Sequence, residues 1–189
     1  MKVFLVHCWG GGSRNCWRGW LADQLRAQGI EVIAPDLPNT NTPILEEWLS
    51  EIRNQIKKFE EKEEWILVGH SLGCPFILRL LESFTQKEKI KGAILVAAFA
   101  KDLGVPEVRN FVEQEFNWKK IKSKSSKFIV INSDNDPFIE LEEGKRIAKN
   151  LDGEFLIEHG AGHINEGSGF TKYPRVLELV LKLLQKDKK

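Results

Sequence analysis

Six short apolar runs recur along the chain, and the segments between them have the spacing of amphipathic helices. The runs occupy residues 3–6, 32–34, 65–68, 93–98, 128–131 and 155–157. Because each run is continuous rather than alternating, it is typical of a strand covered on both faces, as in a parallel sheet. Parallel strands need crossover connections, which the helical segments provide. The chain is therefore predicted to form a three-layer α/β/α sandwich with a six-stranded, mainly parallel sheet.

The segment between the second and third runs shows the helical pattern over the greatest length. Its apolar residues form one helix face: Leu45, Trp48, Leu49, Ile52, Ile56 and Phe59. The pattern predicts a helix that Thr42 caps and that has Pro43 in its first turn. Similar apolar stripes predict further helices near Trp17, Leu141 and Pro174.

Length and composition narrow the class of protein. A chain of 189 residues suits one buried core, so we expect a single domain over residues 1–189. The 28 basic and 27 acidic side chains nearly cancel, and no basic stripe predicts nucleic-acid binding. The apolar runs are far shorter than the roughly 20 residues that a membrane span needs. Three cysteines without C-x-x-C spacing suit a reducing compartment, so we expect free thiols and a cytoplasmic protein.

A candidate nucleophile follows the third run, in the stretch "LVGHSLGCP", which contains G-x-S-x-G at residues 69–73. A strained turn between a buried strand and a helix can lift a serine hydroxyl above the sheet. Gly69 and Gly73 suit so tight a turn, because a side chain at either position would collide with neighbouring backbone. Ser71 is therefore the candidate nucleophile. The alternative is an ordinary strand-to-helix turn with a capping serine.

A serine nucleophile needs a general base that is itself held by a carboxylate. The fifth run leads into "INSDNDPF", with Asp134 and Asp136, and the sixth into "HGAGHINEG", with His159 and His163. Loops that follow parallel strands meet at one edge of the sheet. The order Ser71, Asp136, His163 is also the chain order of α/β-hydrolase triads. These loops are therefore expected to supply the acid and the base.

Within each pair one residue is favoured. His163 is set among glycines and can reach over the serine turn, whereas His159 lies near the strand end. Asp136 precedes a proline, which restricts it to an extended conformation. Asp134 is expected to form a turn, and Asp102, after the fourth run, is a distant second candidate.

The glycine run in "FLVHCWGGGSRNCW" fits neither a nucleotide site nor a metal site. The third position of G-x-G-x-x-G would fall on Asn15, and no P-loop pattern occurs. His7, Cys8 and Cys16 lack a recognised zinc spacing. We therefore expect no metal and no cofactor.

Several of these stretches together resemble a known family. "GHSLG", "NCWRGW", "DLG", "NWKKIK", "DNDPF" and "GAGH" are similar to the retinoblastoma-binding serine hydrolase family, a compact branch of the α/β-hydrolase superfamily. The resemblance extends from Val3 to about Leu184. It implies a catalytic triad of Ser71, Asp136 and His163. It also implies little or no lid, because only residues 99–126 separate the fourth and fifth strands.

The resemblance gives the glycine run a role. In this fold the backbone N–H after the nucleophile, here that of Leu72, is one oxyanion donor, and the loop after the first strand supplies the other. Trp9 is the expected second donor, with Gly10 as the alternative, and glycines 10–12 would let backbone approach the reacting carbonyl. Trp9 and Phe138 could line the substrate pocket or belong to the core. Many relatives in the superfamily have His-Gly where this chain has His7-Cys8, which leaves the role of Cys8 open.

These inferences predict a serine hydrolase of the carboxylesterase type. Its expected partner is a small acyl substrate, a carboxylic ester or else a thioester or amide, cleaved through an acyl-serine intermediate. No membrane or nucleic-acid partner is expected, and the sequence identifies no protein partner. Two other functions use the same features: a non-catalytic binding protein with this fold, and an acyltransferase with the same triad.

Overall fold

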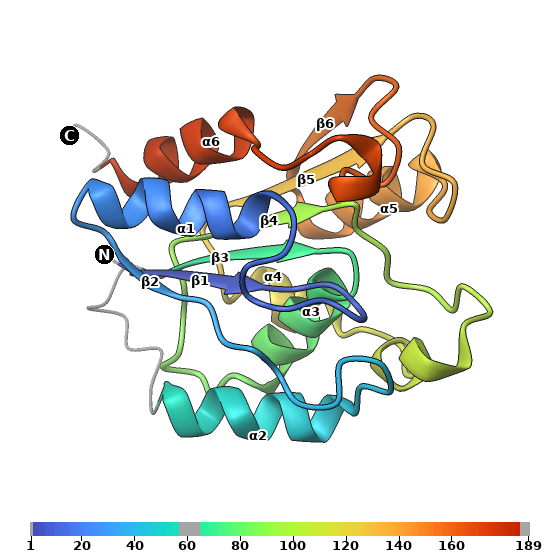
Figure 1. Ribbon diagram of the computed structural model, residues 1–189. Helices are drawn as coiled ribbons and strands as arrows, with labels where there is room; N and C mark the ends of the chain where they lie inside the picture. Colours follow the sequence, from blue (N-terminus) through green and yellow to red (C-terminus); the bar gives the residue numbers. More distant parts are fainter. Residues whose placement is uncertain (1, 57–64, 186–189) are drawn as a thin grey trace.

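The computed structural model describes residues 2–56 and 65–185, which build one six-stranded sheet between two layers of helices (Figure 1). The strand order is β2-β1-β3-β4-β5-β6, and every pair is parallel. The strands are β1 (Lys2–Val6), β2 (Glu31–Ile33), β3 (Trp65–His70), β4 (Gly92–Val96), β5 (Phe128–Ser133) and β6 (Glu154–Glu158). All six lie on the predicted apolar runs. The predicted six-stranded parallel sheet is thus confirmed.

Helices cover both faces of the sheet. Helices α1 (Trp17–Ala27) and α6 (Pro174–Leu184) lie on one face, seen at the top of Figure 1. The other face is covered by α2 (Leu45–Gln55), α3 (Gly73–Ser83), α4 (Trp118–Lys122), α5 (Leu141–Leu151) and the 3-10 helix η1 (Pro106–Phe111). A second 3-10 helix, η2 (Glu166–Ser168), lies in the loop after β6.

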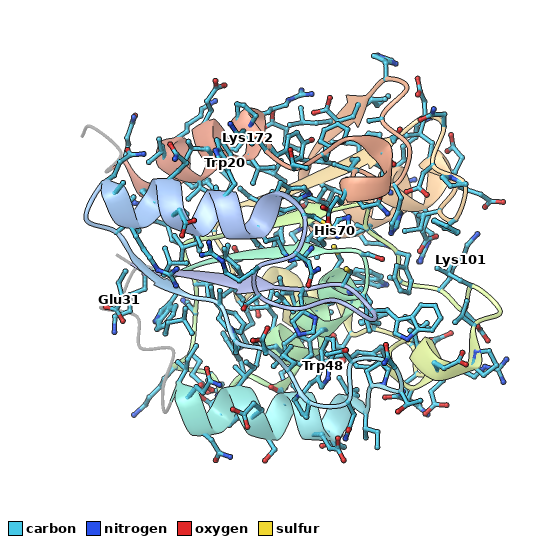
Figure 2. The ribbon with its side chains drawn as sticks, in the orientation of Figure 1. Trp20, Glu31, Trp48, His70, Lys101 and Lys172 are labelled. Carbon is cyan, nitrogen blue, oxygen red and sulfur yellow. The ribbon has the colours of Figure 1, made fainter. Side chains whose placement is uncertain are left out.

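Alternation along the strands divides the core into two clusters. In β1, Val3 and Leu5 pack under α1 and α6, whereas Phe4 and Val6 point to the opposite face. Buried tryptophans anchor both layers, and Trp48, labelled in Figure 2, is fully buried against the rings of Phe76 and Phe111. Truncating such a buried ring typically costs about 3–5 kcal/mol of stability. The two clusters therefore fix the sheet and, with it, the loops at its carboxyl edge.

Two of the predicted strands differ from the expectation of burial on both faces. β2 and β6 are the edge strands, and their residues are largely exposed or half-buried. The central strands β3, β4 and β5 are buried along their whole length. Only the strands in the middle of the sheet are therefore buried on both faces, because helices cover them on either side.

The start of α2 corrects a predicted cap. The helix begins at Leu45, so Thr42 does not cap it and Pro43 lies before its first turn. Instead, Asn110 of η1 accepts a hydrogen bond from the Leu45 amide (2.7 Å) and donates one to the Pro43 carbonyl (3.0 Å). A residue 65 positions away in the chain thus takes the place of the local cap. Phe59 of the predicted stripe lies outside the described residues.

The segment between β4 and β5 contains more structure than the sequence indicated. Helix α4 occupies the start of the polar stretch at residues 119–127 and buries Ile121. η1 precedes it, so two short helices cover this part of the sheet. Within residues 2–56 and 65–185, no helix is long and apolar enough to cross a membrane.

Candidate active site

Ser71 lies in the turn between the buried strand β3 and helix α3, at the carboxyl edge of the sheet. Its φ angle is +53°, a left-handed conformation that is unfavourable for a residue with a side chain. The flanking glycines allow the turn to close. A Cβ on Gly69 would lie 2.7 Å from the Gly73 carbonyl oxygen, and one on Gly73 would lie 2.7 Å from the Val6 carbonyl oxygen. The strained turn predicted around G-x-S-x-G is therefore present.

His163, in the loop after β6, connects the serine to a carboxylate. Its Nε2 lies 3.0 Å from Ser71 Oγ, and its Nδ1 lies 2.8 Å from Asp136 Oδ2. Because a carboxylate accepts, Nδ1 carries the hydrogen and donates it to Asp136. Nε2 is then free to accept the Ser71 hydroxyl proton. This is the arrangement that a serine nucleophile and its general base require.

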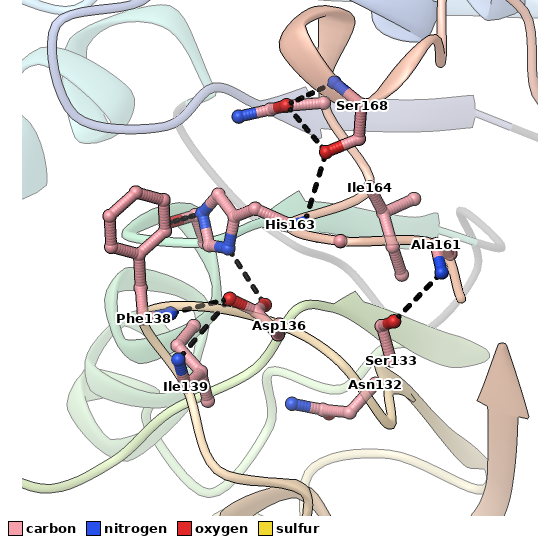
Figure 3. Close-up of polar contacts among 12 residues, drawn as sticks. Asn132, Ser133, Asp136, Phe138, Ile139, Ala161, His163, Ile164 and Ser168 are labelled. Carbon is pink, nitrogen blue, oxygen red and sulfur yellow. Dashed lines mark hydrogen bonds and ion pairs between the residues drawn. The ribbon is translucent and has the colours of Figure 1, made fainter. Parts of the chain in front are cut away.

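Asp136 is held by backbone amides as well as by the imidazole (Figure 3). Its Oδ1 accepts hydrogen bonds from the amides of Phe138 (2.9 Å) and Ile139 (3.2 Å). The carboxylate is fully buried, and the His163 side chain is only 12% exposed. Both groups thus have fixed positions with little access for solvent.

Side-chain hydroxyls position the loop that carries the base. Ser168 Oγ accepts a hydrogen bond from the His163 amide (3.2 Å), and Ser133 Oγ, at the end of β5, accepts one from the Ala161 amide (3.1 Å), as Figure 3 shows. One contact comes from η2 and the other from the sheet, so two different elements hold the backbone that leads to His163.

The other candidate acids and base lie outside this arrangement. His159 is 80% exposed and pairs with Asp134 at 2.6 Å. The pKa of Asp134 is lowered, first by the hydrogen bond from the Gly160 amide and then by that from His159. Asp102 accepts a hydrogen bond from the Gly104 amide and pairs with Arg109. Asp134 and Asp102 therefore shape turns, as was expected of Asp134.

The glycine run differs in detail from the predicted oxyanion loop. The Gly10 amide donates to the Thr40 carbonyl (2.8 Å), so it is not available as an oxyanion donor. In the described chain, the amides of Trp9 and Leu72 have no hydrogen-bond acceptor. Gly11 makes room for a side chain, because a Cβ there would lie 2.8 Å from Cys8 Sγ. Gly11 thus accommodates a neighbouring side chain.

A pocket of about 290 Å³ opens beside Ser71 and His163. Its apolar walls are Trp9, Leu72, Phe99, Leu103, Val105, Val108, Phe138 and Ile139, and the other lining residues are Cys8, Cys16, His70, Asn165, Glu166 and Gly167. Trp9 is 44% exposed and Phe138 is 67% exposed, so both belong to the pocket wall rather than to the core. The Phe138 ring packs edge-on against the His163 ring. The pocket suits an apolar group next to the serine.

Sequence reasoning missed two residues of the site. His70 is fully buried directly before Ser71, and it contacts both Arg18 (3.2 Å) and the backbone carbonyl of His163 (3.0 Å). The only signal in the sequence was the position of His70 inside G-x-S-x-G. Nothing in the "NCWRGW" stretch indicated that Arg18 would be buried beside it.

Comparisons with known proteins identify relatives of this chain. The family model described as "Serine hydrolase" matches residues 3–182. The YdeN protein of Bacillus subtilis (strain 168) is 32% identical over 188 residues, which cover 98% of this chain and 97% of that protein. The crystal structure of the ydeN gene product from B. subtilis superposes with a TM-score of 0.92, covering 98% of this chain and 99% of that one.

A more distant neighbour has the same fold. The monoacylglycerol lipase of Paleococcus ferrophilus has a TM-score of 0.73 at 20% identity and covers 96% of this chain and 94% of its own. These findings support the serine-hydrolase part of the sequence resemblance. They do not support the narrower retinoblastoma-binding name.

Proposed function

The chain belongs to the serine hydrolase family, and from this premise we propose that it cleaves small carboxylic esters through an acyl intermediate on Ser71. One observation carries the proposal. The His163 imidazole contacts Ser71 Oγ through Nε2 and Asp136 through Nδ1. That pairing is the one in which a histidine can take a proton from serine while a carboxylate stabilises the resulting imidazolium.

The proposed reaction has two halves. His163 Nε2 takes the hydroxyl proton as Ser71 Oγ attacks the ester carbonyl carbon, and the carbonyl oxygen becomes an oxyanion. The oxyanion accepts hydrogen bonds from the amides of Leu72 and Trp9. Collapse of this intermediate releases the alcohol, which receives the proton from His163. A water molecule then attacks the acyl carbon as His163 takes one of its protons. Collapse of this second intermediate breaks the bond between the acyl carbon and Ser71 Oγ, His163 returns the proton to Oγ, and the acid leaves.

The pocket supports an uncharged, apolar acyl group as the part of the substrate that is recognised. Phe99, Leu103 and Val108 form part of its wall, and the described pocket contains no lysine or arginine. At about 290 Å³, it is at the small end of the usual range for ligand sites. Esters with short to medium acyl chains therefore fit the pocket best.

A series of p-nitrophenyl esters from acetate to dodecanoate tests the proposal. We expect kcat/KM to rise and then fall along the series, and Ser71→Ala to reduce it by a factor of about 10³ or more. Ser126→Ala, in an exposed loop, is the matched control and should keep wild-type kinetics.

Three results would contradict the proposed function or its nucleophile. Saturable binding of ester without turnover would indicate a binding protein. Turnover that yields a new ester only when an alcohol acceptor is added would indicate an acyltransferase. Turnover that survives Ser71→Ala would contradict the proposed nucleophile.

A further inference from the structure

Arg18, the second residue of α1, is buried without a carboxylate partner. Its side chain is 1% exposed, and no acidic residue in the described chain pairs with it. Its Nε has no hydrogen-bond partner there either. A buried guanidinium without a counter-ion is costly to fold, because its charge loses hydration without a compensating ion pair. An arginine in this position therefore needs a reason other than stability.

The guanidinium bridges two parts of the candidate active site. One nitrogen, Nη2, donates to the Gly12 carbonyl (3.2 Å) and lies 3.7 Å from Cys8 Sγ, both in the glycine loop after β1. The other, Nη1, lies 3.2 Å from His70 Nδ1. Arg18 thus joins the loop expected to supply an oxyanion donor to the residue next to the nucleophile. Figure 2 labels His70 in the interior, near the carboxyl ends of the central strands.

The contact with Arg18 determines which nitrogen of His70 carries hydrogen. Arginine has donors and no acceptor, so His70 Nδ1 must accept. The hydrogen of the neutral ring is then on Nε2, which donates to the backbone carbonyl of His163 at 3.0 Å. Burial, followed by the positive charge of Arg18 and the electrostatic effect of the neighbouring His163 ring, holds the pKa of His70 well below its usual value of 6.5. His70 therefore stays neutral and in one tautomer.

We propose that Arg18 and His70 are positioning residues that hold the backbone of the His163 loop in register with the glycine loop. The chain of contacts runs from the Gly12 carbonyl through Arg18 and His70 to the His163 carbonyl. This inference rests on the proposed function, because it assigns His163 the role of base. Cys8 belongs to the same cluster, because its thiol lies 3.7 Å from Arg18 Nη2 and lines the pocket.

Replacing Arg18 with an uncharged residue distinguishes a positioning role from a packing role, because the two roles predict different effects on activity. If Arg18 only packed the interior, replacing it with methionine would leave activity per folded molecule unchanged. If it positions His163, the same change removes an uncompensated charge and yet misplaces the base. Misplacement by about 1 Å can cost on the order of 100-fold in rate. We therefore expect Arg18→Met to lower kcat by about 10- to 100-fold, with little change in KM and no fall in thermal midpoint.

Arg79→Met is the matched control. Arg79 is the other buried arginine of the described chain, 8% exposed, but it pairs with Glu82 and donates to the Phe111 carbonyl. Its replacement should lower the thermal midpoint and leave kcat within about twofold. The positioning role is wrong if Arg18→Met keeps wild-type kcat. It is also wrong if Arg18→Met loses activity together with a fall in thermal midpoint as large as that of Arg79→Met.

Substitutions of His70 test the second contact. Glutamine can place an amide donor near the position of Nε2, whereas leucine has no donor. We expect His70→Leu to lower kcat by about 10- to 100-fold at nearly constant KM, and His70→Gln to recover most of that loss. Equal activities of the two variants, with both folded, would overturn the proposal.

Nitrogen-15 NMR of the histidine rings provides a test that needs no activity. The wild-type protein should show His70 with hydrogen on Nε2 alone, and Arg18→Met should shift the His70 tautomer balance and the His163 ring signals. A wild-type Nδ1–H tautomer, or unchanged signals in Arg18→Met, would contradict the positioning role. If the wild type hydrolyses no ester, the proposed function fails, and the NMR result still decides the positioning role.

Discussion

Asp134 and Asp136 are two residues apart in one loop, yet the fold gives their carboxylates opposite environments. The Asp136 carboxylate is fully buried against His163, and Asp134 is partly exposed beside His159. Because the loop turns between them, the two side chains serve different imidazoles. Each acid therefore has its own histidine, and only one of those histidines reaches Ser71.

Replacing each acid with asparagine tests this difference. Asp136→Asn keeps the size of the side chain but removes the charge that stabilises the imidazolium, so kcat should fall by about 10³- to 10⁴-fold. Asp134→Asn is the matched control and should stay within about threefold of wild type. Steady-state kinetics on a p-nitrophenyl ester measures both. Equal losses in the two variants would show that Asp136 is not the acid of the triad.

The sequence predicted site residues where their order in the chain and their neighbouring residues were informative. Ser71 follows the third strand inside G-x-S-x-G, and Asp136 and His163 follow the fifth and sixth strands, in the chain order of a known triad. The contact between Arg18 and His70 spans 52 positions and leaves no periodic trace, so it needed the structure. The same holds for the Gly10 amide, whose acceptor is Thr40.

At the scale of elements, the serine turn depends on the close approach of α3 to β1. A Cβ on Gly73 would lie 2.7 Å from the Val6 carbonyl oxygen, which is backbone and cannot rotate away. Gly73→Ala should therefore lower the free energy of unfolding by about 1–3 kcal/mol. It should also reduce esterase activity, because Ser71 moves with the start of α3.

Gly167→Ala is the control for Gly73→Ala. Gly167 has no left-handed φ, and an added Cβ would meet only the Asn165 side chain, at 3.3 Å. Its free energy of unfolding should change by less than about 0.5 kcal/mol. Urea denaturation measures both variants. A Gly73→Ala protein as stable as Gly167→Ala would contradict the close approach of α3 to β1.

Most elements could be predicted because their patterns are local. Continuous apolar runs located all six strands, and apolar stripes located α1, α2, α5 and α6. The start of α2 and the presence of α4 could not be predicted in this way. Asn110 replaces the local cap of α2. Helix α4 has only five residues, and burial of Ile121 stabilises it. Both depend on partners that are distant in sequence.

At the scale of the whole molecule, two buried histidines link stability to pH. Burial is the largest cause that lowers the pKa of His7 and of His70. The usual value for both is 6.5, so below that pH the unfolded chain binds protons that the folded chain does not. Stability is therefore unaffected by these two groups above pH 6.5 and falls as the pH drops below it.

Urea denaturation between pH 7.5 and 5 measures this linkage, with the range chosen above the usual titration of carboxylates. Both histidines should make stability fall toward the acid end, and the contribution of His70, whose pKa lies well below 6.5, should approach about 1.4 kcal/mol per pH unit there. His70→Gln removes one of the two groups and should reduce the slope accordingly. A slope that is identical in His70→Gln and wild type would contradict the neutral, buried state of His70.

The central claim, that Ser71 is a nucleophile activated by His163, can be measured directly with a fluorophosphonate probe. Intact-mass spectrometry should show one probe on each chain, and peptide mapping should locate it on Ser71. Labelling should be absent in Ser71→Ala and at least about 100-fold slower in His163→Ala. Wild-type protein that stays unlabelled at saturating probe, or label that persists in Ser71→Ala, would contradict the claim.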